Sequence, residues 1–355
     1  MLVLPPSDGL LWARPWLAIG FFLRRVRRAG KECWLHMRRS FCVMSAFLPA
    51  SGGFRVAILG DVHGMWRGAA EAEVLERVVK PDLFVAVGDY GNEDAAFVEA
   101  LVASTSCLSG ARYFFLGNHD AWLSGKAGVA SEALLRLKAA CGELDCGYRR
   151  VEVPSATGVF SLVGARPLSW GGGIKSTNAK SWNLLSELYG VRNAEESLGV
   201  VTDALLGSVG PAIVVAHQGP AGLGDDRAAI CGRDWTKRAA DFGDDDLRDA
   251  LDTARDGGAP VALCVFGHMH SALSGGGRRR MVHVDDRGTL HVNAAEVPRH
   301  RKNPAHGADD VHFTVVDVDD RGSPIRVLGV WLNEEAGLAA HDVLWARPAP
   351  PPAPS

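Results

Sequence analysis

The chain has 355 residues, long enough to bury a large core, and its 47% hydrophobic and 22% charged residues are ordinary for a soluble globular protein. Residues 1–45 carry eight Lys or Arg against two acids, a net charge of +6, so the total of −3 leaves −9 on the remainder. Because a protein that tracks nucleic-acid phosphates needs a basic surface, this acidic body argues against a stable nucleic-acid partner.

Residues 1–53 have the composition of a targeting extension, rich in Arg and poor in acids, with an apolar patch at Trp16–Leu23. The patch is too short to span a bilayer, so no transmembrane segment is expected. Positive charge follows the patch at Arg24–Arg28, whereas a secretory signal would have it in front. An organelle transit peptide is the first interpretation. A start at Met37 or Met44, or a membrane or secretory role, stays open.

The chain has seven cysteines, an odd number, and none forms a C-x-x-C pair. Cys107, Cys141 and Cys264 lie in apolar surroundings, as reduced core residues do. We therefore expect a reducing compartment.

Strand and helix patterns alternate from residue 54 onward. Apolar runs predict three parallel strands at Phe54–Leu59, Leu83–Val87 and Tyr113–Leu116, joined by helices at Ala69–Val79 and Ala95–Val102. A further helix is expected at Ser131–Cys141, with Ser131 as its N-cap.

The second half of the chain begins with a predicted hairpin and then returns to alternation. Its expected elements are strands at 148–153, 159–165, 212–216 and 261–266 and helices at 181–189, 194–206 and 245–255. Short strands at 281–284, 289–293, 312–317 and 325–331 then predict an antiparallel part that closes a second sheet. Residues 336–355, rich in proline at their end, are expected to form a disordered tail.

Five of the apolar runs end in side chains that can bind metals. In chain order these are Asp61 with His63, then Asp89, then Asn118 with His119 and Asp120, then His217, and last His268 with His270. Such residues gather at one place when they follow the carboxyl ends of strands in an open α/β sheet. Taken singly, each is more commonly a turn or packing residue, but the ordered set favours a metal site.

This order of motifs, Asp-x-His, Gly-Asp, Gly-Asn-His-Asp, His and Gly-His-x-His, resembles the signature of the calcineurin-like metallophosphoesterases. The resemblance implies an α/β fold over residues 54–335, a four-layer α/β/β/α sandwich with two mixed sheets. It also implies that Asp61, His63 and His270 hold one metal, that Asn118, His217 and His268 hold the other, that Asp89 bridges them, and that His119 is the general acid.

The implied function is a dinuclear metal-dependent phosphoesterase, in which a hydroxide shared by two divalent cations attacks a small phosphomonoester or phosphodiester in line. Asp120 either orients His119 or caps the following segment. Ligands of this kind without a thiolate accommodate Mn, Fe, Zn or Mg. The alternative is a non-catalytic metal-binding scaffold or interaction module on the same fold.

Two departures from relatives refine this picture. Protein Ser/Thr phosphatases of the superfamily read Gly-Asp-x-x-Asp-Arg-Gly, and this chain has the acid Glu93 in place of the arginine, which disfavours that activity. The loops between motifs resemble a branch found in cyanobacteria and plastid-bearing eukaryotes, which with the basic leader predicts a plastid address, the cytoplasm or mitochondrion being alternatives. Candidates for the wall of a substrate pocket, which would otherwise be core anchors, are Arg166, Trp170, Arg233, Trp122 and Trp235.

Overall fold

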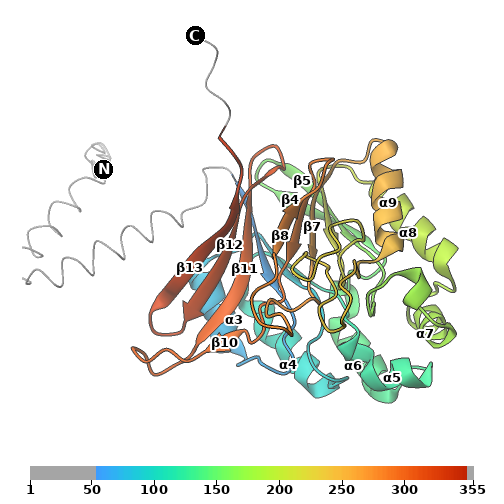
Figure 1. Ribbon diagram of the computed structural model, residues 1–355. Helices are drawn as coiled ribbons and strands as arrows, with labels where there is room; N and C mark the ends of the chain where they lie inside the picture. Colours follow the sequence, from blue (N-terminus) through green and yellow to red (C-terminus); the bar gives the residue numbers. More distant parts are fainter. Residues whose placement is uncertain (1–52, 350–355) are drawn as a thin grey trace, which may run out of the picture. The chain divides into compact units, whose positions relative to one another are not determined.

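The computed structural model describes residues 53–349, which belong to one compact unit. Two mixed β-sheets lie face to face, and helices flank them (Figure 1). The first sheet has the strand order β13-β12-β11-β1-β2-β3, with β10 beside β11, and the second has the order β4-β5-β6-β7-β9-β8. The expected α/β sandwich with two mixed sheets is confirmed.

The first half of the chain follows the predicted alternation. It contains β1 (Phe54–Leu59), α3 (Ala69–Val78), β2 (Leu83–Ala86), α4 (Ala95–Ser104), β3 (Ala111–Phe114), α5 (Trp122–Ala127) and α6 (Glu132–Cys141). Strands β1, β2 and β3 pair in parallel, as predicted. The Ser131 side chain accepts a hydrogen bond from the Leu134 amide and caps α6, also as predicted.

The second half supplies the second sheet and the helices that cover it. Its elements are β4 (Arg150–Ser155), β5 (Gly158–Gly164), α7 (Ala179–Tyr189), α8 (Ala194–Leu206), β6 (Ala212–Val215), α9 (Asp245–Asp256), β7 (Val261–Phe266), β8 (Val282–Val284) and β9 (Leu290–Asn293). Helix α8 packs on β5 and against α9, while α3 packs on the last two strands of the chain, which belong to the first sheet (Figure 1).

The last strands correct the prediction for the C-terminal part. Only β8 and β9 join the second sheet; β10 (His300–Arg301), β11 (Asp310–Val318), β12 (Pro324–Asn333) and β13 (Gly337–Ala346) extend the first. The parallel unit grows from β1 towards β3, so the other edge of β1 stays free, and β11 pairs there antiparallel. Residues 337–346, expected in a disordered tail, pair with β12 along the length of β13.

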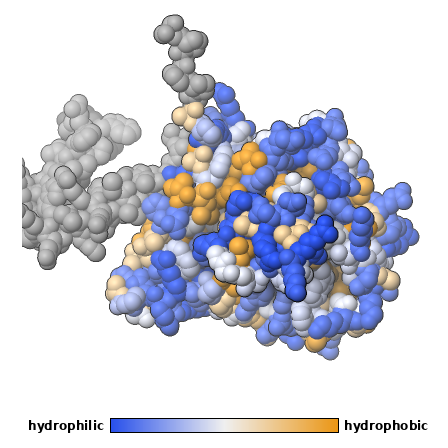
Figure 2. Space-filling view, in the orientation of Figure 1, coloured by the Kyte–Doolittle hydropathy of each residue, from blue (hydrophilic) through white to orange (hydrophobic). Residues whose placement is uncertain are grey.

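The core lies between the two sheets. Val56, Ile58 and Val85 of the first sheet meet Leu162 and Val265 of the second in one buried apolar cluster. Figure 2 shows a largely hydrophilic face, with hydrophobic residues gathered towards the C-terminal strands. Residues 1–52 and 350–355 lie outside the described part, so the targeting extension and the plastid address stay predictions. Within residues 53–349, no helix has the length and apolar character needed to cross a bilayer.

A buried ion pair ties the C-terminal strands to α3. Arg299 donates to Glu71 at 2.7 Å, and the two side chains are 1% and 0% exposed. The Glu71 carboxylate also lies 2.9 Å from His300 Nε2. Burial would raise the pKa of Glu71, but the Arg299 charge lowers it overall.

We expect Glu71→Gln to lower the free energy of unfolding by about 3–5 kcal/mol at pH 7, because it leaves a buried guanidinium without its counter-charge. Urea denaturation measures this loss. Since the folded pKa of the carboxyl lies below its unfolded value, the difference should be complete above about pH 5 and shrink as pH falls. Glu99→Gln, which removes an exposed partner of Arg136, should cost less than about 1 kcal/mol. Equal losses in the two variants would contradict this account.

Candidate metal centre

The predicted metal ligands come from the carboxyl ends of strands in both sheets. Asp61, Asp89 and Asn118 follow β1, β2 and β3 of the first sheet, whereas His217 and His268 follow β6 and β7 of the second. The sequence predicted that strand ends would gather them and that the fold would have two mixed sheets. The structure brings two facing sheet edges together, so the site closes only when the two sheets pack.

The backbone is strained at these positions. Asp61, His63, Asp89 and His268 have φ angles of 40°, 45°, 56° and 64°, in the left-handed region that non-glycine residues rarely adopt. Such conformations cost of order 1–3 kcal/mol each and cluster where function requires a side chain to be aimed. The chain therefore maintains costly geometry at four of the seven predicted ligands.

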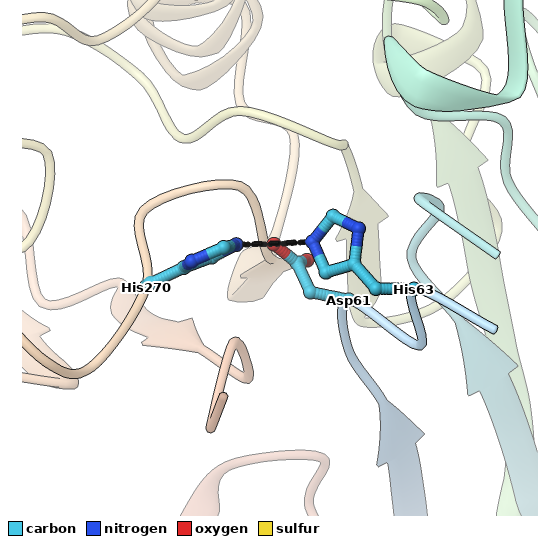
Figure 3. A group of neighbouring side chains, drawn as sticks. All are labelled: Asp61, His63 and His270. Atoms are coloured by element: carbon cyan, nitrogen blue, oxygen red, sulfur yellow. Dashed lines mark hydrogen bonds and ion pairs between the residues drawn. The ribbon is translucent and has the colours of Figure 1, made fainter. Parts of the chain in front are cut away.

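One group consists of Asp61, His63 and His270, whose side chains point towards one another (Figure 3). The Nε2 atoms of His63 and His270 are 3.1 Å apart. Asp61 Oδ2 lies 3.2 Å from His270 Nε2. This oxygen is buried and makes no hydrogen bond within the described residues, whereas Oδ1 accepts from the His268 amide at 2.9 Å.

The second group surrounds His217. Its Nδ1 lies 2.8 Å from the Val87 carbonyl oxygen, which can only accept, so Nδ1 carries the proton there. The Nε2 atom faces Asn118 Oδ1 at 2.8 Å, Asp89 Oδ1 at 3.2 Å and His268 Nδ1 at 3.2 Å. A hydrogen bond from Nδ1 to a carbonyl is the usual way a protein orients a histidine that binds metal through Nε2.

The charges at this second group are compatible with a cation. Burial would lower the pKa of His217, but the Asp89 carboxylate raises it to about 9. Burial together with the charge on His217 lowers the pKa of His268 to about 4. A proton on His217 thus takes the position that a cation would fill, and metal binding would release it.

The donor set fits divalent cations. Carboxylate and imidazole ligand atoms lie within 4.8 Å of one another in each cluster, Asn118 Oδ1 lies 2.8 Å from His217 Nε2, and Asp61 Oδ2 is buried without a hydrogen bond. Unpaired buried acceptors that face each other are costly unless a positive charge lies between them. With oxygen and nitrogen ligands and no thiolate, the set suits Mn, Fe, Zn or Mg.

His119 lies beside both groups. It forms a cluster with His63 and Asp89, and its ring meets the His63 ring edge-on at 5.0 Å. Its Nδ1 is 2.7 Å from Asn92 Oδ1, so the amide oxygen accepts the Nδ1 proton. Asn92 was missed by sequence reasoning, although it lies three residues after the predicted ligand Asp89.

Asp120 does not orient His119. Its carboxylate is fully buried and accepts hydrogen bonds from the backbone amides of Gly117, Asp89 and Tyr90 at 2.8, 2.9 and 2.8 Å. Asp120 therefore fixes the two loops that carry Asp89 and Asn118. The prediction of a catalytic role is replaced by a structural one, and the contact to His119 comes from Asn92.

Comparison with protein families decides the relationship. The model of the calcineurin-like phosphoesterases matches residues 54–272, more than half of the chain. The chain belongs to this family. It is a metal-dependent phosphoric ester hydrolase.

Solved structures with related architecture include a dimetal phosphatase from Danio rerio, at 14% identity and a TM-score of 0.46, covering 83% of this chain and 99% of that one. Another is TT1561 of Thermus thermophilus, at 11% identity and a TM-score of 0.46, covering 76% and 100%. A metallophosphoesterase from Sphaerobacter thermophilus has 13% identity and a TM-score of 0.28, covering 79% and 88%. A comparison with curated protein sequences found no match.

The phosphoesterase has an open cleft of about 550 Å³ over the predicted ligands. Trp122, Trp170 and Trp235 line it, as expected for the pocket wall. Arg166 does not line this cleft: it is buried and pairs with Asp246 at 2.7 Å and Asp244 at 3.1 Å. That guanidinium joins the loop after β5 to the start of α9, and its charge is already paired with these two carboxylates.

Two further arginines differ from the expectation. Arg233 is absent from the cleft lining and donates within its own loop, to the Arg238 carbonyl at 3.4 Å. Arg279, which sequence reasoning missed, does line the cleft. Its guanidinium donates hydrogen bonds to backbone carbonyls, including those of Ala229 at 2.8 Å and His270 at 3.0 Å. It holds two loops of the cleft together.

Gly117 leaves room for two of the predicted metal ligands, Asp89 and His217. A Cβ atom there would overlap Asp89 Oδ1 and lie 2.6 Å from His217 Cε1. We expect Gly117→Ala to weaken metal affinity and activity by about 10- to 100-fold, as displaced ligand supports do. Metal titration and hydrolysis assays measure both.

Gly199→Ala in α8 is the matched control, because nothing lies within 4 Å of a Cβ there. It should leave metal affinity unchanged and stabilise the helix by up to about 1 kcal/mol. Unaltered metal binding in Gly117→Ala would contradict the proposed placement of Asp89 and His217.

Proposed function

We propose that the enzyme hydrolyses a small phosphomonoester or phosphodiester with two divalent cations. Asp61, His63 and His270 would hold one, Asn118, His217 and His268 the other, and Asp89 would contact both. When bound, such a pair supplies charge that stabilises phosphoryl oxygens and makes a water acidic enough to act as the nucleophile. The phosphoester would then lie in the cleft, whose lining includes Asp89, Asn118, His268 and His270.

His119 would serve as the general acid. Because Asn92 accepts the Nδ1 proton, a protonated ring presents its Nε2–H to the departing oxygen and donates that proton as the ester bond breaks. Trp122, whose ring stacks on the imidazole at a centroid distance of 4.6 Å, limits rotation of His119. The chain's own residues thus position the proton donor before substrate arrives.

The observation that carries the proposal is the convergence of seven buried or half-buried side chains that can bind metals. These side chains do not supply enough hydrogen-bond donors to pair every acceptor among them. His63 and His270 present ring nitrogens to each other at 3.1 Å, beside the unsatisfied Asp61 oxygen. In a packed core or a surface turn, buried acceptors are normally paired with hydrogen-bond donors.

Metal removal tests the proposal. Protein treated with EDTA and desalted should hydrolyse p-nitrophenyl phosphate or bis(p-nitrophenyl) phosphate at under about 1% of its Mn²⁺-loaded rate, because charge stabilisation and nucleophile activation are lost together. Adding Mn²⁺ back should restore the rate, and EDTA saturated with Ca²⁺ is the control. Activity that survives chelation, or inert protein with every added metal and both ester types, would overturn it.

A further inference from the structure

The cleft has an aromatic wall that begins at the proposed general acid. The His119 ring stacks on Trp122 at 4.6 Å and 21°, and Trp122 continues to Trp170 at 5.3 Å. Trp235 and Phe242, whose centroids are 4.9 Å apart, also line the cleft. Trp170 and Trp235 are 39% and 51% exposed, which is unusual for such large apolar side chains unless they meet a ligand or partner.

Charge inside the cleft offers no second anchor for phosphate. No lysine lines it, and among the described lining residues Arg279 is the sole arginine. That side chain is 2% exposed and donates to carbonyl oxygens and to Asp234, itself a lining residue. Beyond the predicted metal ligands, His119 and Arg279, the cleft is lined by aromatic rings, three aliphatic or thioether side chains, the Ser274 hydroxyl and the Asp234 carboxylate.

The position of His119 determines which part of the substrate meets this wall. A general acid must lie within hydrogen-bond reach of the departing oxygen, so the leaving group occupies the side of the cleft where His119, Trp122 and Trp170 lie. A volume of about 550 Å³ is in the range of small-molecule sites and has room for a ring beside the phosphoryl group.

We infer that the alcohol released by this enzyme carries a planar aromatic ring, which stacks on Trp170 next to His119. This inference depends on the proposed function, because the role of His119 places the leaving group. Stacking of a flat ring on an aromatic side chain changes binding by roughly 5- to 150-fold, enough to select among phosphoesters without a second charged contact.

Benzyl phosphate and cyclohexylmethyl phosphate test the inference, since their alcohols have similar size and acidity and only one ring is flat. The Mn²⁺-loaded wild type should prefer the benzyl ester by at least about 5-fold in kcat/KM. Trp170→Ala should lose most of that preference and Trp170→Phe should keep it. Leu123→Ala, which removes an exposed apolar side chain outside the cleft lining, should behave as wild type.

Equal kcat/KM for the two esters in wild type, or an equal loss on both in Trp170→Ala, would overturn the inference while the proposed hydrolysis stands. Binding of benzylphosphonate and cyclohexylmethylphosphonate, measured by calorimetry, separates the two proposals further. If neither ester is hydrolysed but benzylphosphonate binds more tightly through Trp170, ring recognition is supported, and the proposed function fails only if p-nitrophenyl phosphate and bis(p-nitrophenyl) phosphate are also inert. Equal phosphonate affinities would overturn ring recognition.

Discussion

Asp89→Asn should lower kcat for an aryl phosphoester by about 10²- to 10⁴-fold, because the one carboxylate proposed to contact both cations loses its charge while keeping its shape. Asp89 is suited to that role. It is buried, its Oδ1 accepts from the His119 amide at 2.8 Å and lies 3.2 Å from His217 Nε2, and it belongs to clusters with both His63 and His268. Burial would raise its pKa, but His217 lowers it well below its usual value, so the group is charged at neutral pH.

Steady-state hydrolysis and metal content should be measured together on this variant. Asp225→Asn, an exposed loop substitution with the same change of charge, is the control and should keep both values. An Asp89→Asn enzyme that retained more than about a third of wild-type kcat with full metal content would refute the bridging role.

His119→Ala should show the second largest effect, and the effect should depend on the leaving group. Alkyl phosphates release a basic alkoxide that needs a proton, so kcat should fall about 10²- to 10⁴-fold. p-Nitrophenyl phosphate releases a stable anion and should lose less than about 10-fold. Asn92→Ala should give a smaller loss in the same direction. The imidazole can still donate its proton, but Nδ1 loses its hydrogen-bond partner.

A leaving-group series measured on wild type, His119→Ala and Asn92→Ala separates proton donation from simple damage to the site. Proton donation predicts that the slope of log kcat against the acidity of the leaving alcohol steepens when His119 is removed. A parallel fall for alkyl and aryl esters would show that His119 supports the ligands rather than donating a proton.

Local sequence patterns were enough to predict much of the fold and the candidate ligands. Each ligand follows an apolar run, so a strand and its polar end could be recognised together, and Ser131 could be recognised as a cap within one turn. Pairings between distant segments could not be recognised from such local patterns. Nothing near Val316 in the sequence shows that its strand pairs with β1, because the free edge of β1 exists only after the parallel unit has formed.

The errors in the site have the same origin. Arg166 has the composition of a phosphate contact, but its partners Asp244 and Asp246 lie about 80 residues later and are brought to it by the packing of α9. Asp120 was expected either to orient His119 or to cap the following segment, but its carboxylate accepts hydrogen bonds from the backbone amides of Asp89 and Gly117 at the two strand ends.

Metal stoichiometry tests the central claim most directly. Active protein equilibrated with Mn²⁺, freed of loosely bound ions and measured by elemental analysis, should contain about two ions per chain. Asp89→Asn should contain clearly fewer. Fully active protein with less than one bound ion per chain would contradict a dinuclear centre formed by Asp61, Asp89 and His217.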